Sequence, residues 1–133
     1  MTRTPNKTFH TPLAAVTTAG SHNPIDVSDY ETIAVQLEAS GGSVDMTVAF
    51  KGSIAGESPA FSSAAAAITN PWAKLAFTEL TTSTETSGAT DIALSGAGVT
   101  LYEIEAKALK WFGVDVTAHT AGTLTVRVFA KGT

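Results

Sequence analysis

Strict alternation of apolar residues near the C-terminus constrains this chain more than any other feature of its sequence. Between residues 112 and 130, apolar side chains stand at every second position on both sides of a short polar stretch: Phe112, Val114, Val116 and Ala118, then Leu124, Val126, Val128 and Ala130. A period of two is typical of strands that bury one face. The sequence therefore predicts two strands here, each with one face in a core.

The residues between these two runs predict a β-hairpin. A three-residue loop at 120–122 favours a glycine in the left-handed region at its last position, and Gly122 stands there. Such a loop predicts a register with three favourable cross-strand pairs: Asp115 with Arg127, Thr117 with Thr125, and Gly113 with Phe129. We expect this hairpin at the centre of the fold.

A second alternating stretch, from Ile33 to Phe50, predicts another hairpin around a loop at residues 40–43. In that hairpin Glu38 would face Asp45, and like charges placed directly opposite destabilise a sheet. The pairing could slip near the turn, the two strands could enter different sheets, or a cation or a partner's positive group could lie there. A local irregularity is the interpretation that we favour.

Composition and the remaining segments predict the fold class. Ala, Thr, Ser and Gly are abundant, whereas Leu, Lys and Glu are scarce, which favours strands and loops over helices. Further short strands are expected around Phe77, at 92–94 and at 99–106. The sequence predicts an all-β domain at residues 24–133, a two-sheet antiparallel β-sandwich or jelly roll of about seven or eight strands.

Residues 1–23 are interpreted as an extended N-terminal arm with a possible first strand at 13–18. Few apolar residues occur in this segment, so its first ten residues are not expected to order by themselves. A frayed tail and an arm that docks on a neighbouring subunit both remain open. The second hypothesis gives three candidate partner contacts: Phe9, Pro12 and Leu13.

Charge and composition limit the classes of function. The chain has no cysteine, which excludes disulfides and thiolate metal sites. Its net charge is −4 and Lys and Arg do not cluster, which disfavours binding to nucleic acid. The sequence shows no secretion signal and no apolar run of membrane-spanning length, so we expect a soluble protein made in a cytoplasm, without membrane contact.

No group of residues forms a recognisable catalytic motif. His10, His22 and His119 are far apart in the sequence, and each is expected in a tail or turn, so all three are interpreted as solvated histidines. Ser53 and Ser95 lack the strand, turn and helix context of a hydrolase nucleophile. We therefore expect no enzyme activity, no cofactor and no bound metal.

Trp111 and Phe129 would lie diagonally on the outer face of the predicted C-terminal hairpin, where their rings could meet. The favoured interpretation is that a further strand or the Ala-rich segment at 64–67 covers them. Otherwise they form an apolar patch for a partner or a sugar ring, and both are candidate partner contacts. A carbohydrate-binding module would use Trp72 or Trp111 as a stacking platform.

Four stretches carry a resemblance to known proteins: Pro24–Val27 with Tyr30–Thr32, Phe50–Ser53, Leu101–Ile104, and Trp111–Val126 around its Thr-Ala-Gly-Thr turn. In these stretches the chain resembles the small β-sandwich virion proteins of tailed bacteriophages, which decorate or cement capsids or serve as head or tail accessory subunits. The chain departs from them after Ser53, where Ile54, Ala55 and Gly56 replace an Asn-Asp-Gly turn followed by a tryptophan.

The resemblance implies a non-enzymatic homo-oligomer, often a trimer, that is located in the virion. Its partners would be copies of itself and the major capsid protein or other virion proteins. The function that follows is capsid decoration or cement, which stabilises the head through protein–protein contacts. A carbohydrate-binding or receptor-binding β-sandwich module of a tail or an adhesin is the alternative.

Overall fold

The computed structural model describes residues 7–59, 61 and 67–132. Within these residues the chain forms nine β-strands and no helix, which confirms the predicted all-β fold class. The strands are β1 (Lys7–Val16), β2 (Ile25–Asp26), β3 (Thr32–Ser53), β4 (Ala73–Lys74), β5 (Phe77–Glu79), β6 (Thr84–Thr86), β7 (Ile92–Leu94), β8 (Gly98–Glu105) and β9 (Trp111–Lys131). In the part of the chain described, no helix could span a membrane.

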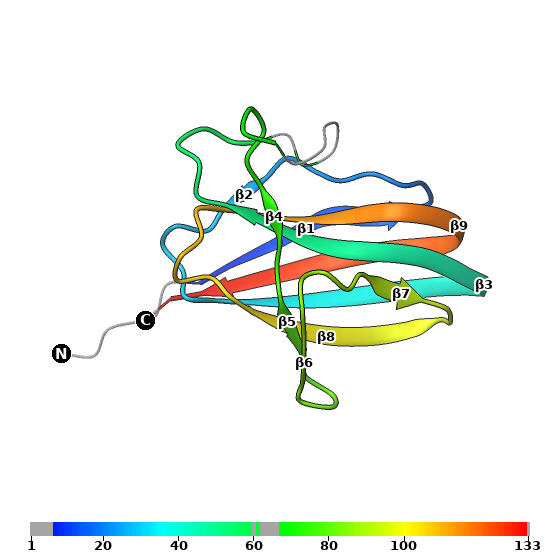
Figure 1. Cartoon of the computed structure of the whole chain (residues 1–133). Coiled ribbons are helices and arrows are strands. Elements are labelled where there is room, and N and C mark those ends of the chain that lie inside the picture. The colour runs from blue at the N-terminus through cyan, green and yellow to red at the C-terminus, as the bar shows by residue number, and fades with distance from the viewer. Residues whose placement is uncertain (1–6, 60, 62–66, 133) are drawn as a thin grey trace.

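All of these strands belong to one hydrogen-bonded antiparallel sheet. β3 and β9 are by far the longest strands, and they pair with each other along nearly their whole length. Both turn back on themselves at the same end of the molecule (Figure 1). The sheet therefore folds over into two layers, and the two layers remain joined through β3 and β9.

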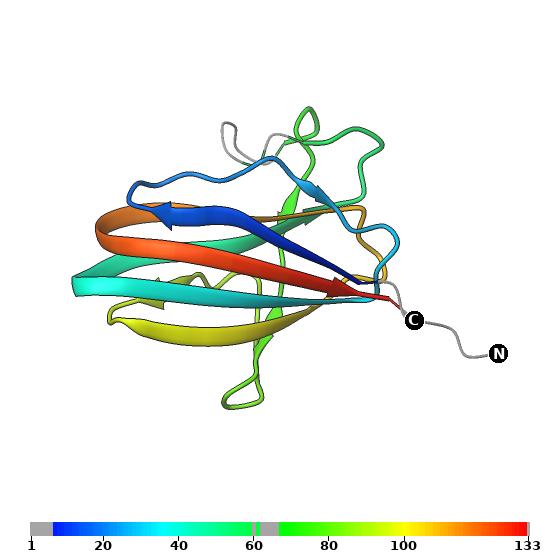
Figure 2. The same cartoon turned by 180° about the vertical axis from the view of Figure 1, so that it is seen from behind.

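The first layer, called here the β8 layer, has the order β1, second half of β9, first half of β3, β8, β5 and β6. The second layer, the β7 layer, contains the first half of β9 and the second half of β3. In that layer β2 borders β9, and β4 and β7 border β3. Seen from behind, β1 lies beside the C-terminal half of β9 (Figure 2).

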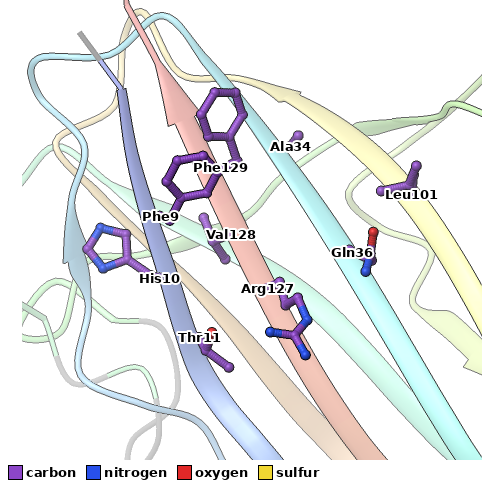
Figure 3. Close-up of a pocket in the computed structure, with 9 residues that line it drawn as sticks. All are labelled: Phe9, His10, Thr11, Ala34, Gln36, Leu101, Arg127, Val128 and Phe129. Carbon is purple, nitrogen blue, oxygen red and sulfur yellow. The ribbon is translucent and has the colours of Figure 1, made fainter.

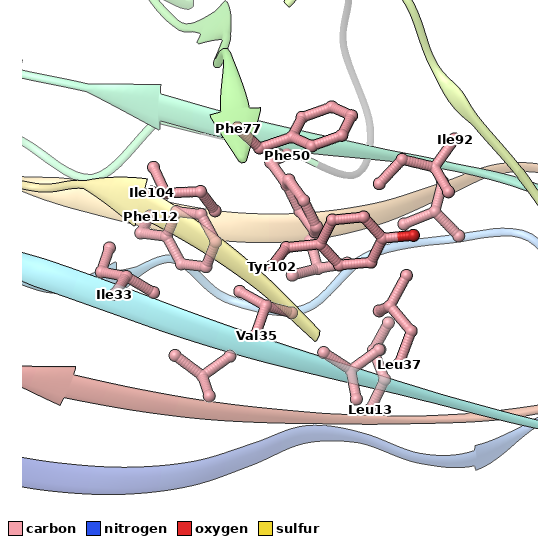
Figure 4. Close-up of a cluster of buried hydrophobic side chains, with 14 of the residues drawn as sticks. Leu13, Ile33, Val35, Leu37, Phe50, Phe77, Ile92, Tyr102, Ile104 and Phe112 are labelled. Carbon is pink, nitrogen blue, oxygen red and sulfur yellow. The ribbon is translucent and has the colours of Figure 1, made fainter. Parts of the chain in front are cut away.

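The core lies between the two layers (Figure 4). Apolar residues alternate in the sequence because every second side chain of a strand points into this core. Nearly all even-numbered apolar residues of β9 are buried there: Phe112, Val114, Val116, Leu124, Val126, Val128 and Ala130. At the centre, the rings of Phe50, Phe77 and Tyr102 pack edge to face, with centroids 5.3 to 5.6 Å apart. Aromatic pairs in this geometry stabilise a core beyond the area they bury.

The predicted C-terminal hairpin is wrong in its pairing, because the two halves of β9 lie in different layers. Asp115 pairs with Ala49, and Arg127 pairs with Gln36. β3 pairs along one edge of each half, β1 pairs along the other edge of the second half, and β2 pairs with the start of the first half. Strands that face each other across a core show the same period of two as neighbours in a sheet, so alternation cannot separate the two arrangements.

The conflict between Glu38 and Asp45 is removed by the same folding over of the sheet. The two residues lie on opposite sides of the bend in β3, and their strands enter different layers. Glu38 forms an ion pair with Arg127 and accepts a hydrogen bond of 2.8 Å from the Gln36 amide. Of the alternatives considered for this conflict, the one in which the two strands separate is therefore right. The favoured local irregularity in a β3 hairpin is wrong, because the two halves of β3 do not pair.

The N-terminal segment is part of the sheet and does not form a separate arm. β1 pairs with the second half of β9, and Leu13 is buried in the core. Residues 1–6 of the predicted arm lie outside the described residues. The possible first strand predicted at residues 13–18 overlaps β1, which begins earlier, at Lys7. Backbone pairing orders this segment although its side chains bury little, and composition does not report backbone pairing.

The segment after β3 packs on the outer side of the β7 layer. The Phe61 ring is fully buried against Gly113, where an added Cβ would lie 2.3 Å from Phe61 Cδ2. The ammonium group of Lys51 donates to the Phe61 carbonyl at 2.9 Å and forms an ion pair with Asp115 at 2.8 Å. Gly113 is thus covered by Phe61 and not, as predicted, by Phe129.

We expect Gly113→Ala to lower the free energy of unfolding by about 1–3 kcal/mol, because the added methyl group overlaps the Phe61 ring. Phe61→Ala should cost about 3–5 kcal/mol through the lost burial. The double variant should lose less than the sum of the two, because the overlapping ring is gone. Urea denaturation of all four proteins measures this coupling.

Gly42→Ala is the matched control, because nothing lies within 4 Å of a Cβ at that position. This substitution should leave the free energy of unfolding nearly unchanged. Strictly additive losses in the Gly113 and Phe61 variants would contradict the contact.

Candidate functional site

The side of the β8 layer that is turned away from the core, called here the β8 face, carries the most prominent exposed aromatic group. Phe9 of β1 is 74% exposed, and its ring stacks on Phe129 of β9 with centroids 4.7 Å apart. The two residues are register partners in the sheet. A pair of strands therefore holds the two rings side by side on the outside of the molecule (Figure 3).

A shallow hollow of about 280 Å³ lies beside this aromatic pair (Figure 3). Ala34 pairs with Phe129 on the neighbouring strand, and its small side chain leaves room between larger ones. The other residues that line the hollow are Phe9, His10, Thr11, Gln36, Leu101, Arg127, Val128 and Phe129. The hollow is mainly apolar and can accept a side chain of another protein surface.

The position of Arg127 at this hollow is fixed by its neighbours. The guanidinium group donates to the Glu38 carboxylate, which also accepts from the Gln36 amide. The hydrogen bond from Arg127, and then that from Gln36, lower the pKa of Glu38 below its usual value. Glu38 therefore stays ionised at neutral pH, and the ion pair persists beside the apolar residues.

The structure brings only some of the predicted contact residues together. Phe9 and Phe129 meet on the β8 face, whereas Leu13 is buried in the core and Pro12 is half-buried. Trp111 lies in the other layer, where it pairs with Ser53 and not with Phe129. The prediction of a shared Trp111 and Phe129 face is therefore wrong, because it rested on the hairpin that does not form.

Both tryptophans are held by contacts within the chain. The Trp111 indole N–H donates to the Ala55 carbonyl at 2.9 Å. The Lys51 ammonium lies 3.8 Å from the centroid of the Trp72 ring and covers it as a cation–π contact. These contacts explain both side chains as part of the packing around the segment after β3.

An apolar groove of about 470 Å³ runs along Trp72, Leu75 and Leu109 on the same part of the molecule. The Ser53 hydroxyl at this groove already donates to the Pro71 carbonyl and accepts from the Ala55 N–H. Sugar sites combine a stacking ring with polar groups that are free to bind hydroxyls. At this groove the Ser53 hydroxyl is occupied and the unpartnered Trp72 indole nitrogen is buried, so neither group is exposed to a sugar hydroxyl.

His22 is not the solvated histidine that the sequence suggested. Its Nε2 accepts a hydrogen bond of 3.0 Å from the Val114 N–H, and its Nδ1 donates to the Asn23 carbonyl at 2.7 Å. An N–H only donates and a carbonyl only accepts, so these partners fix the neutral form with the proton on Nδ1. No sequence motif signals this role, because both partners are backbone groups.

His119 likewise has a backbone partner, since its Nε2 lies 2.7 Å from the Gly122 carbonyl and donates to it. Within the described part of the chain, no three His, Asp or Glu side chains gather in a way that could hold a metal ion. What the site offers chemically is an apolar contact surface with one fixed ion pair.

We expect the free energy of unfolding to depend on pH through His22. Burial, as the largest cause, holds the pKa of His22 below its ordinary value of 6.5 in the folded chain. The unfolded chain therefore binds more protons below pH 6.5, and stability should fall from there down to the folded pKa. Above pH 6.5 this contribution is fully present. Urea denaturation at several pH values measures it.

His22→Asn is the comparison variant for this measurement. This substitution removes the titrating ring, so the variant should be less stable at neutral pH. Its free energy of unfolding should also lose the part of the decrease at low pH that comes from His22. An unchanged pH profile in His22→Asn would contradict the assignment.

No protein-family model matches this sequence, and no curated protein sequence matches it. Among solved structures, the chain is similar to the crystal structure of the SPBc2 prophage-derived protein YomS, with a TM-score of 0.74. The match covers 99% of this chain and 98% of that chain at 16% sequence identity. At this identity the likeness shows a shared fold, and that fold extends over nearly the full length of both chains.

Proposed function

We propose that this protein is a non-enzymatic bacteriophage virion structural protein that decorates or cements the capsid. The observation that carries the proposal is the fold shared over nearly the full chain with a prophage-derived protein. The resemblance of four sequence stretches to small virion proteins of tailed phages supports the same class. In this role the protein contacts copies of itself and the major capsid protein, and it stabilises the head through these contacts.

The β8 face supports this function physically. Phe9 and Phe129 expose apolar rings on a rigid sheet, so a partner can bind them without ordering a flexible loop first. Burial of apolar area contributes about 25 cal/mol per Å², and aromatic residues are enriched at the centre of protein interfaces. A surface of this kind fits repeated protein–protein contact in a particle.

The proposal predicts that the protein is a fixed component of the virus particle. Particles of the phage that encodes the chain should contain it in constant ratio to the major capsid protein, as measured by quantitative mass spectrometry of gradient-purified virions. After heads and tails are separated, the protein should remain with the heads. Its absence from particles would refute the virion role, and its presence on tails alone would refute the decoration role.

Loss of the gene should leave heads that form but release their DNA at a lower temperature, because the added contacts are missing. Purified protein, added back to such heads, should bind and restore the release temperature. Heat-denatured protein serves as the control. Heads of equal stability with and without the gene would contradict the cementing function.

A further inference from the structure

Charge is distributed unevenly over the β8 face. One row of register partners crosses the sheet from Lys7 on β1 to Lys131 on β9, Thr32 on β3 and Glu105 on β8. The two lysines and Glu105 are exposed. Glu103, also exposed, lies on the β8 side of the next row. The β1 and β9 side of the face is therefore basic, and the β8 side is acidic.

The apolar groups of the β8 face are divided in the same way. The large rings of Phe9 and Phe129 lie on the basic side. On the other half, Ala34 is the register partner of Phe129 and lies at the hollow, and Leu101 is 40% exposed beyond it. The aromatic group thus lies on one half of the face, and the hollow lies between the halves, where small Ala34 leaves room opposite the large rings.

We propose that two copies of this chain bind each other through their β8 faces, about a two-fold axis that runs parallel to the strands between β9 and β3. Such a rotation exchanges β1 with β8 and β9 with β3, and it keeps each row opposite itself. Lys7 of one copy then lies opposite Glu105 of the other. Phe129 lies opposite Ala34 and fills the hollow beside it.

Charge complementarity identifies the second copy as the partner. A partner with a surface of one charge would match only one side of the β8 face, whereas a second copy matches both sides at once. A two-fold axis across the strands would instead place β1 and β9 against the same strands of the other copy, so that the basic side faces the basic side. Only the axis parallel to the strands makes this face complementary to itself.

The inference specifies the self-contact of the proposed virion protein and replaces the trimer implied by the resemblance with a dimer. It concerns the purified chain alone and is tested without virus particles. A failure of this test would leave the virion role open, and absence from virions would leave the dimer open.

Sedimentation equilibrium of the full chain should show a reversible dimer. The variant Lys7→Glu with Lys131→Glu makes both sides acidic, and Glu103→Lys with Glu105→Lys makes both sides basic. Each double variant alone should dimerise at least about tenfold more weakly than the wild type, because like charges meet. An equimolar mixture of the two should form a mixed dimer again, since each acidic side then meets a basic one.

A charge swap in the other layer is the control. Lys74 of β4 and Asp91, the residue before β7, form a partly exposed ion pair at 2.8 Å. Lys74→Asp with Asp91→Lys should leave dimerisation unchanged. In Ala34→Trp the new ring occupies the hollow, so the dimer should be lost while cooperative thermal unfolding, followed by circular dichroism, is retained.

Four results would overturn the proposal. They are a wild-type chain that stays monomeric at all concentrations, a trimer, a mixture that dimerises no better than its separate components, and a dimer that the Ala34 variant does not weaken.

Discussion

Backbone pairing between β3 and β9 on both sides of their common bend is the constraint on which the rest of the structure depends. Each strand enters both layers, so two strands join the layers, and the layers can part only if both strands straighten at the bend. Because of the bend, the same face of each strand points toward the core both before and after the bend. Val116 and Val126 consequently pack in one core although they belong to different layers. The β8 face then follows, because it is the opposite side of that alternation.

Burial could be predicted from the sequence, but strand partnership could not. The period of two correctly placed Val114, Val126 and Ile33 in the core, since burial depends only on which side a residue points. The partner of Asp115 depends on whether the chain near Gly122 forms a tight hairpin or a bend between two layers. A glycine with positive φ, such as Gly122, is compatible with both. The clash predicted between Glu38 and Asp45 was the one sequence signal that the two halves of β3 separate.

The candidate site was predictable only in part for the same physical reason. Phe129 was identified at an outward position and Phe9 as a partner contact of the N-terminal arm, but their contact with each other depends on pairing between β1 and β9. Trp111 and His22 were misassigned because both bind backbone groups, which composition does not mark. Trp111 binds the carbonyl of Ala55. His22 binds the carbonyl of Asn23 and the N–H of Val114. The Lys51 and Asp115 ion pair was likewise hidden, because the two residues are distant in sequence and adjacent only after folding.

The pairing of β1 with β9 has a consequence for synthesis of the protein. β1 leaves the ribosome long before its partner β9, so this edge strand waits unpaired until β9 has been made. An unpaired strand can bind other nascent chains. β1 carries Pro12, register shifts on both sides of Leu13 and a positive φ at Ala15, and these irregularities hinder straight pairing with a foreign strand.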